Sequence, residues 1–211
     1  MLPAANHWPK ALRSARPLKI LTTMAIEFSA ESKREIADLI AKYPNKQAAL
    51  LPALHIAQRD FGFVGDEVIH VVASELGVPP SLVQEVATFY TLYSRRPVGD
   101  YIIAVCQTLS CAMRGASSVL AHLESTLGVH IGETTADGKF TLTTAECLAS
   151  CGTAPMFQVT ARDYSLNTFY ENLTVARVDE ILDELRKRPP IKAAAEMKSL
   201  TTHSIGGHHH G

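Results

Sequence analysis

The sequence predicts an α+β protein in which a small helical bundle precedes a sheet packed against helices. Apolar residues recur with helical spacing between residues 29 and 93, and a strand-like apolar run follows directly after residue 99. Strand-like and helix-like segments then follow one another to residue 188. We therefore expect a flexible N-terminal extension (1–28), a helical bundle (29–98), an α+β domain (99–188) and a flexible C-terminal tail (189–211).

Composition and charge limit the class of protein. Of the 211 residues, 46% are hydrophobic and 19% are charged, which is typical of a folded globular chain. Lys and Arg total 20 against 21 Asp and Glu, and this balance does not indicate a nucleic-acid partner. No apolar run approaches the ~18–20 residues of a membrane-spanning helix, so we expect a soluble chain without direct membrane insertion.

The two ends of the chain differ in composition from the rest. Residues 1–26 contain four basic residues and no acid, which leaves three alternatives: an organelle transit segment, a disordered extension, or an upstream start before Met24. Near the other end, Pro189 and Pro190 should stop the preceding helix. The His-rich tract at 208–210 is interpreted as a tail or tag remnant without function.

Four amphipathic helices are predicted in the bundle. Ser32 with Glu35, and Ser81 with Gln84, have the spacing of capping boxes that open the first and fourth helices. Gly77 should end the third helix. The predicted apolar faces are Ile36, Leu39 and Ile40; Leu50, Leu54 and Ala57; Val68, Ile69, Val72, Ala73 and Leu76; and Leu82, Val86, Phe89 and Tyr90.

The second half has strand and helix patterns in alternation. Residues 101–105 (YIIAV) form an apolar run that predicts a strand buried on both faces. Further strands are expected at 140–143, after a turn at Asp137-Gly138, and at 156–160. Helices are expected at 116–127, ending at Gly128, and from Val178 to Leu185. This order is typical of an α+β or thioredoxin-like domain.

All four cysteines lie in this second half, as Cys106-x4-Cys111 and Cys147-x3-Cys151. Each pair follows a predicted strand, so we expect both pairs at one end of the sheet. Three chemistries remain open from the spacing: a [2Fe–2S] cluster, which takes four thiolates; a structural zinc site, which takes four as well but whose usual tight knuckles the first pair fits poorly; and unliganded or disulfide cysteines.

The residues around the cysteines favour a charged cofactor. Cys111 precedes the 116–127 helix, whose N-terminal amides would stabilise a thiolate. Gly152 would allow close approach of backbone to a sulfur atom. Arg114 is near enough in sequence to offset negative charge, with a solvated helix Arg as the alternative. His55 and His70 lack the spacing of a metal-binding pair and are interpreted as structural or surface residues.

With these motifs in view, the chain resembles the small [2Fe–2S] subunit of the NADH-dehydrogenase module of respiratory complex I (NADH:quinone oxidoreductase). The resemblance covers roughly residues 30–188. It is carried by ALHIAQRDFGF (53–63), EVATFYTLY (85–93), VCQTLSCAMRG (105–115), ECLASCGTAPM (146–156) and NLTVARVDEIL (172–182). Val175 stands where many relatives of this kind have a proline.

The resemblance implies a helical bundle followed by a thioredoxin-like ferredoxin domain, in which Cys106, Cys111, Cys147 and Cys151 ligate one [2Fe–2S] cluster. It implies an electron-carrying subunit without catalytic residues of its own. The implied partners are an FMN- and NADH-binding flavoprotein subunit and further complex I subunits. The implied location is cytoplasmic, on the peripheral arm of an inner-membrane complex, or on the matrix side in a mitochondrion. It also raises the expectation of a cis bond before Pro155.

Three rival functions remain at this point. NAD-linked hydrogenases and formate dehydrogenases use similar diaphorase subunits, a zinc-stabilised interaction module would use the same cysteines, and a thiol redox protein would need a Cys-x-x-Cys pair that the sequence lacks. The sequence has neither the G-x-G-x-x-G nor the phosphate-loop motif. This agrees with a chain whose partner binds NADH.

Overall fold

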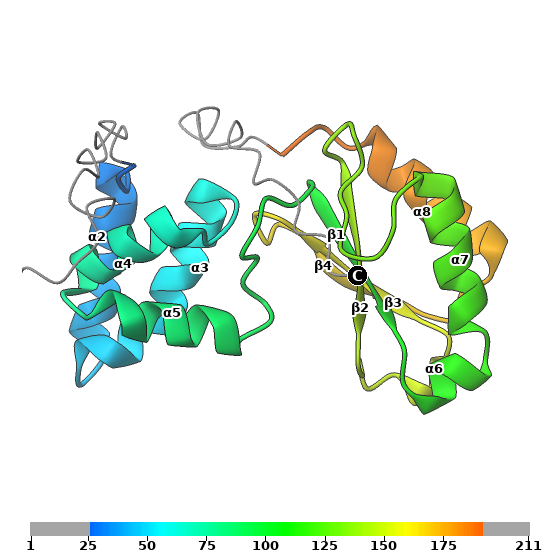
Figure 1. The fold of residues 1–211 in the computed structure, drawn as a ribbon, viewed down its shortest axis with the longest axis horizontal. Helices are drawn as coiled ribbons and strands as arrows, with labels where there is room; N and C mark the ends of the chain where they lie inside the picture. Colours follow the sequence, from blue (N-terminus) through cyan, green and yellow to red (C-terminus); the bar gives the residue numbers. More distant parts are fainter. Residues whose placement is uncertain (1–25, 192–211) are drawn as a thin grey trace, which may run out of the picture.

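The computed structural model describes residues 26–191, and the predictions for residues 1–25 and 192–211 lie outside that range. The helices of the first part are α2 (Ala30–Lys42), η1 (Lys46–Ala49), α3 (Leu50–Phe61), α4 (Asp66–Leu76) and α5 (Pro80–Phe89). The second part contains β1 (Tyr101–Cys106), α6 (Leu109–Met113), α7 (Ala116–Leu127), β2 (Phe140–Ala145), η2 (Cys151–Thr153), β3 (Phe157–Ala161), β4 (Asn167–Tyr170) and α8 (Val175–Lys187). Figure 1 shows the helical part and the sheet part joined by the segment after α5.

Buried hydrophobic residues fall into two clusters, one between Phe28 and Tyr93 and the other between Tyr101 and Leu185. Each part therefore has its own core. Phe28, which the sequence-based division leaves in the N-terminal extension, is buried with its ring centroid 5.1 Å from that of Phe61. The bundle core thus begins one residue before the predicted boundary at residue 29.

Helices α3 and α4 agree with the predicted faces. Leu50, Leu54 and Ala57 are all buried in α3, and the five predicted residues of α4 are buried as well. Gly77 ends α4 with φ 64°, a left-handed conformation that glycine adopts without a Cβ penalty. In α2, Ile36 is fully buried, while Leu39 and Ile40 pack on the core from its edge.

Both predicted capping boxes are wrong. Helix α2 begins earlier than expected, because Ser29 is its N-cap and accepts from the Ser32 amide at 3.1 Å. The Ser32 hydroxyl instead donates to the Asp60 carboxylate on α3. Helix α5 starts at Pro80, where proline is favourable as the first helical residue, so Ser81 lies inside the helix and no side chain caps it.

The predicted apolar face of α5 is also wrong. Val83 and Ala87 are buried in the bundle, whereas Phe89 is 76% exposed and Tyr90 is 37% exposed. The buried face is therefore shifted by one residue from Leu82 and Val86, both of which are only half-buried. When a helix has hydrophobic residues on two faces, the sequence alone does not indicate which face is buried.

The sheet has the strand order β2–β1–β3–β4, with β1 parallel to β2 and antiparallel to β3. Along β1, Tyr101, Ile103 and Val105 are buried while Ile102 and Ala104 are half-buried. The prediction of a strand buried on both faces was therefore wrong, because α7 and α8 lie on the same side of the sheet (Figure 1).

Three elements of the second part have no counterpart in the prediction: the short helices α6 and η2 and the edge strand β4. The predicted helix ends are confirmed. Gly128 ends α7 with φ 67°, and α8 stops at Lys187 before the two prolines. Val178, Ile181, Leu182 and Leu185 of α8 are buried. No helix within residues 26–191 has the length and apolarity to cross a membrane.

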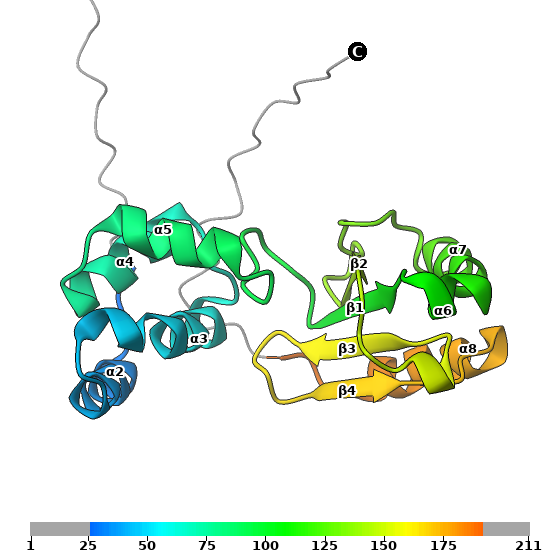
Figure 2. The same cartoon turned by 90° about the horizontal axis from the view of Figure 1, so that it is seen from below.

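The two parts touch where the β3–β4 turn reaches α3, as Figure 2 shows. The Gln58 side-chain amide donates to the Tyr164 hydroxyl at 2.5 Å and to the Leu92 carbonyl at 3.1 Å. The His55 ring meets the Tyr164 ring edge-on at 4.9 Å between centroids. One turn therefore joins the bundle, the connecting segment and the sheet.

Candidate metal centre

The sheet topology brings the two cysteine pairs to one edge. Cys106 is the last residue of β1 and pairs in register with Ala145, the last residue of the parallel strand β2. Because parallel strands end at the same edge, Cys147 follows β2 close to Cys106. Strand β3 is antiparallel and starts at that edge, where Phe157 pairs with Val105, so the preceding loop with Cys151 lies there too.

Hydrogen bonds hold the loops of this edge together. The Gln107 amide donates to the Ala145 carbonyl at 2.9 Å, and the Cys106 amide donates to the Met156 carbonyl at 3.2 Å. The Thr108 hydroxyl donates to the Glu146 carbonyl. The end of β1 and the loop after it are thereby bonded to the segment before Cys147 and to the segment after Cys151.

The first pair is buried, with Cys106 at 4% and Cys111 at 2% exposure. Burial acts to raise the pKa of Cys106, but the amides of Thr108 and Leu148 and the Thr108 hydroxyl outweigh it and lower the pKa. Burial and the adjacent Cys106 thiol raise the pKa of Cys111. The site therefore stabilises negative charge on one sulfur of the buried pair.

The second pair is exposed. Cys147 lies on the surface, where its Sγ accepts from the Ala149 amide at 3.4 Å, and Cys151 begins the short helix η2. Cys151 lies close enough to Cys111 for its charge to raise the pKa of Cys111 further. All four cysteines are free thiols, so the structure gives no support to the disulfide alternative.

The donor set is chemically that of a [2Fe–2S] cluster, which takes four thiolates. Four thiols reach this edge of the sheet, from the end of β1, from α6 and from the connection between β2 and β3. Within residues 26–191, no group of three or more His, Cys, Asp or Glu side chains is gathered closely enough to hold a single metal ion.

Three predictions about the surroundings need correction or comment. Cys111 lies inside the separate helix α6, and the backbone amide that acts to lower its pKa is that of Met156, where an amide of α7 was expected. A Cβ at Gly152 would meet no atom within 4 Å, so the protein alone does not require glycine there. Arg114 is not simply solvated, because its Nε donates to the Ala154 carbonyl at 2.9 Å. The bond between Ala154 and Pro155 is cis, as expected.

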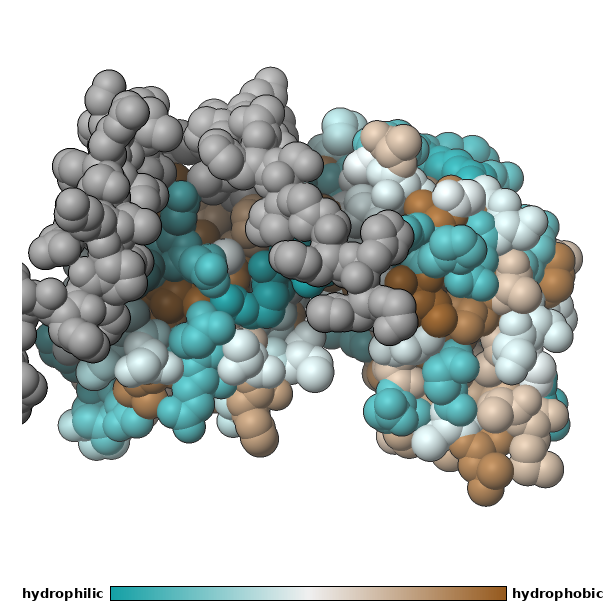
Figure 3. Space-filling view, in the orientation of Figure 1, coloured by the Kyte–Doolittle hydropathy of each residue, from teal (hydrophilic) through white to brown (hydrophobic). Residues whose placement is uncertain are grey.

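Sequence reasoning missed several residues at this edge. Thr108 and Glu171 bind the cysteine loops. Thr108 stands inside the first cysteine motif, where its position could have been noted, whereas Glu171 is 20 residues from the nearest cysteine and has no sequence signal. Leu109 and Met113 are 73% and 79% exposed on α6, one helical turn apart. Their spacing is visible in the sequence but resembles that of a buried helix face. Figure 3 shows hydrophobic surface at the end of the molecule that carries α6.

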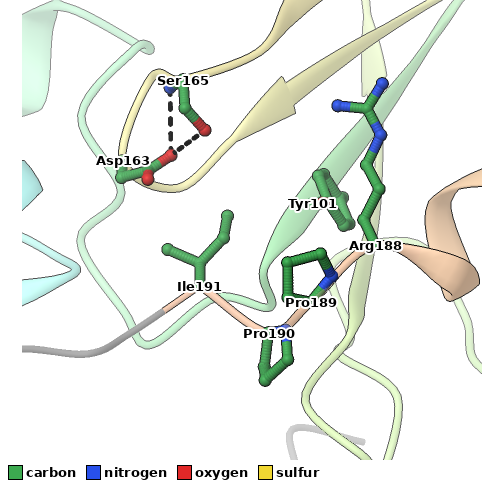
Figure 4. Close-up of a pocket in the computed structure, with 7 residues that line it drawn as sticks. All are labelled: Tyr101, Asp163, Ser165, Arg188, Pro189, Pro190 and Ile191. Atoms are coloured by element: carbon green, nitrogen blue, oxygen red, sulfur yellow. Dashed lines mark hydrogen bonds between the residues drawn. The ribbon is translucent and has the colours of Figure 1, made fainter.

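A shallow pocket lies at the opposite end of β1 (Figure 4). Roughly 16 Å of strand separates Tyr101, which lines it, from Cys106. Asp163 accepts there from the Ser165 amide and hydroxyl at 3.0 and 2.6 Å. Arg188, Pro189, Pro190 and Ile191 form the remaining wall, and none of the four cysteines lines the pocket. It is therefore separate from the candidate metal centre.

His55 and His70 lie away from the cysteines, on the bundle helices α3 and α4. The ring of His55 packs edge-on against Tyr93 and Tyr164, and burial lowers its pKa. This agrees with the interpretation of His55 as a structural residue.

Comparison with known proteins gives one family and a set of relatives. The model of the thioredoxin-like [2Fe–2S] ferredoxin family matches residues 36–186. An NADH-quinone oxidoreductase subunit of Rhizobium meliloti is 44% identical over 154 residues, which cover 73% of this chain and 88% of the relative. An NADH-quinone oxidoreductase subunit of Rickettsia conorii is 40% identical, with 71% and 87% covered. NADH dehydrogenase [ubiquinone] flavoprotein 2 of Dictyostelium discoideum is 37% identical, with 79% and 66% covered.

Among solved structures, an NAD+-reducing [NiFe]-hydrogenase in the air-oxidised state has a similar fold, with a TM-score of 0.56 and 20% identity. The match covers 67% of this chain and 23% of the hydrogenase chain. At this identity the likeness concerns the fold alone.

Proposed function

Because the chain belongs to the thioredoxin-like [2Fe–2S] ferredoxin family, we propose that it is the electron-transfer subunit of an NADH:quinone oxidoreductase. The observation that carries the proposal is the placement of Cys106, Cys111, Cys147 and Cys151 at one edge of the sheet. These four residues are the proposed ligands of one [2Fe–2S] cluster. The chain has its activity as part of the complex and no catalytic residue of its own.

The bound cluster supplies a one-electron carrier, which accepts or releases an electron without making or breaking a bond in the protein. The chain's own residues bind the irons and stabilise the charge. The amides of Thr108 and Leu148 act on Cys106, as its lowered pKa indicates, and the amide of Met156 acts on Cys111. Amide donors aimed at ligand sulfurs stabilise the anionic cluster and help set its potential.

The proposed partner is an FMN- and NADH-binding flavoprotein subunit that oxidises NADH, with further complex I subunits beyond it. Two observations support it. The bacterial relatives above are named as subunits of NADH-quinone oxidoreductases, and this sequence lacks a nucleotide-binding motif. The proposed location is the peripheral arm of an inner-membrane complex, cytoplasmic in a bacterium.

We also propose that residues 29–98 and 99–188 are separate domains. The two hydrophobic clusters support this division, because apart from Phe28 the buried residues of each cluster come from one segment.

A diaphorase subunit of an NAD-linked hydrogenase is the second candidate. It is favoured by the fold of the NAD+-reducing [NiFe]-hydrogenase chain. The identity to that chain is 20%, against 37–44% to the NADH-quinone oxidoreductase relatives, so the first proposal is preferred. Identifying the proteins that co-purify with the chain from its native source distinguishes the two candidates. A hydrogenase large subunit would indicate the hydrogenase, and further quinone oxidoreductase subunits would indicate the NADH:quinone oxidoreductase.

The cluster itself is tested by anaerobic purification followed by reduction. We expect a reddish protein with two irons and two labile sulfides per chain and an electron paramagnetic resonance (EPR) signal of a reduced [2Fe–2S] centre. A colourless protein with one zinc ion per chain would overturn the proposal in favour of the zinc-stabilised module.

A further inference from the structure

One carboxylate is tied to the loop of the second cysteine pair. Glu171 lies just after β4, and its Oε1 accepts from the Thr153 hydroxyl at 2.7 Å and from the Ser150 hydroxyl. Ser150 and Thr153 stand on either side of Cys151 in the sequence. A single carboxylate oxygen therefore bonds both ends of the short helix η2 that begins with Cys151.

The backbone after Glu171 makes further hydrogen bonds to the same loop. The Asn172 amide donates to the Thr153 carbonyl at 2.7 Å, and the Leu173 amide donates to the Pro155 carbonyl at 3.0 Å. Asn172 has φ 48°, a left-handed conformation that turns the chain back towards the loop. The connection between β4 and α8 thus runs along the cysteine loop and is bonded to it at several points.

Arg114 holds the same loop from the C-terminal end of α6. Its Nε donates to the Ala154 carbonyl at 2.9 Å, next to the residues that Glu171 binds. The segment from Ser150 to Ala154 is therefore held by a carboxylate on one side and a guanidinium on the other.

These hydrogen bonds are needed because no residue of η2 is buried in the hydrophobic core. None of its three residues is buried, and Cys151 is exposed. Ala154 is buried just after this helix, but Cys151 itself depends on the hydrogen bonds around it, and a metal ligand must be held within a narrow geometry.

We propose that Glu171 is a positioning residue for the Cys151 loop and that its charge lowers the reduction potential of the bound cluster. This inference rests on the proposed [2Fe–2S] cluster. Two ferric ions, two sulfides and four thiolates sum to a charge of −2, which reduction makes −3. A carboxylate beside the ligand loop disfavours the added electron.

The test uses the full chain, purified anaerobically with its cluster, and three variants. Glu171→Ala removes both the hydrogen bonds and the charge, Glu171→Gln keeps an oxygen acceptor without the charge, and Glu184→Ala removes an exposed carboxylate of α8 as the control. Three quantities are measured: the rate of iron loss to a chelator, the EPR spectrum of the reduced protein, and the midpoint potential.

We expect Glu171→Ala to lose iron about tenfold faster than wild type, because removing a group that supports a metal ligand commonly costs that much or more. Its EPR spectrum should also change. Glu171→Gln should lose iron within about twofold of the wild-type rate, since the acceptor is retained, and should have a higher midpoint potential. Glu184→Ala should match wild type in all three measurements.

A double variant keeps the proposal testable if Glu171→Ala does not fold. Ser150→Ala with Thr153→Val removes the two donors and leaves the carboxylate. This variant should also lose iron faster, and combining it with Glu171→Ala should add little, because all three residues act through the same bonds.

The outcomes separate this inference from the proposed function. If the wild-type chain has no [2Fe–2S] signal, the proposed function fails and this inference fails with it. If the wild-type signal is present, but Glu171→Ala and the Ser150–Thr153 variant lose iron at the wild-type rate, only the positioning role is overturned. An unchanged potential in Glu171→Gln would overturn the electrostatic role.

Discussion

At the scale of single residues, the four cysteines divide into two environments. Cys106 and Cys111 are buried, with pKa values moved in opposite directions, while Cys147 and Cys151 are exposed. The buried pair is placed by the β1 strand end and by α6. The exposed pair depends on loop hydrogen bonds, so the positions of these two thiols are the more sensitive to small changes.

The ligand assignment predicts a clear contrast between two substitutions. Cys147→Ser should lower iron and sulfide content strongly, because it removes a thiolate donor from the proposed cluster. His55→Ala should leave both contents unchanged, since His55 packs on Tyr93 and Tyr164 away from the cysteines. Iron and labile sulfide assays on both purified variants check this. Loss of iron in the His55 variant alone would contradict the assignment.

At the scale of elements, helix α5 illustrates how packing selects one of two apolar faces. The sequence offers Leu82, Val86 and Phe89 on one side and Val83 and Ala87 on another. The bundle buries the second set because its smaller side chains allow α5 to approach α4. Phe89 and Tyr90 remain at the surface, with their ring centroids 5.0 Å apart.

The observed face of α5 predicts which substitution destabilises the bundle. Val83→Ala should lower the free energy of unfolding by about 2 kcal/mol, since it removes two fully buried methyl groups and leaves a cavity. Phe89→Ala should change it by about 0.5 kcal/mol or less, because that ring is exposed. Chemical denaturation of the two variants measures both values, and a larger loss for Phe89→Ala would favour the face first predicted.

At the scale of the whole molecule, Tyr164 connects the sheet to the bundle. Tyr164, with φ 61° in the β3–β4 turn, accepts from Gln58 and packs on His55. Gln58 is itself buried, and its Oε1 accepts from the Ser94 amide at 2.6 Å. The same side chain therefore fixes the connecting segment and the sheet to α3.

Removal of the Tyr164 hydroxyl should loosen this junction. Tyr164→Phe takes away one partner of the Gln58 amide, at a cost of about 1 kcal/mol. Hydrogen exchange should become faster at Ser94, whose amide depends on a fixed Gln58. Tyr43→Phe, at an exposed tyrosine of the bundle, is the control and should leave exchange unchanged. Equal exchange in all three proteins would show that the junction does not depend on this hydroxyl.

Alkaline stability should depend on the same residue. Burial raises the pKa of Tyr164 from 10.0 to about 12. Between these values the folded chain keeps the phenol proton and the unfolded chain loses it, so stability is full below pH 10 and falls as the pH rises towards 12. Tyr164→Phe should show a shallower decline in denaturation midpoints over this range. A decline remains, because burial also raises the pKa of Tyr93.

Several features followed from the amino-acid sequence by itself. Helical periodicity placed α3, α4, α7 and α8, and Gly77 and Gly128 marked the ends of two of them, because local conformational preferences act over a few residues. The paired cysteines and their neighbours indicated the family, since their spacing is a property of the chain alone.

The tertiary structure alone decided which residues meet across long separations. The sequence predicted both cysteine pairs at one end of the sheet, but only the parallel register of β1 with β2 shows that Cys106 meets the loop of Cys147, 41 positions later in the printed sequence. The buried side of α5, the single covered face of the sheet, and the bonds of Glu171 to the Cys151 loop were not visible in the sequence. Each depends on the free energy of packing between elements, which local preferences do not encode.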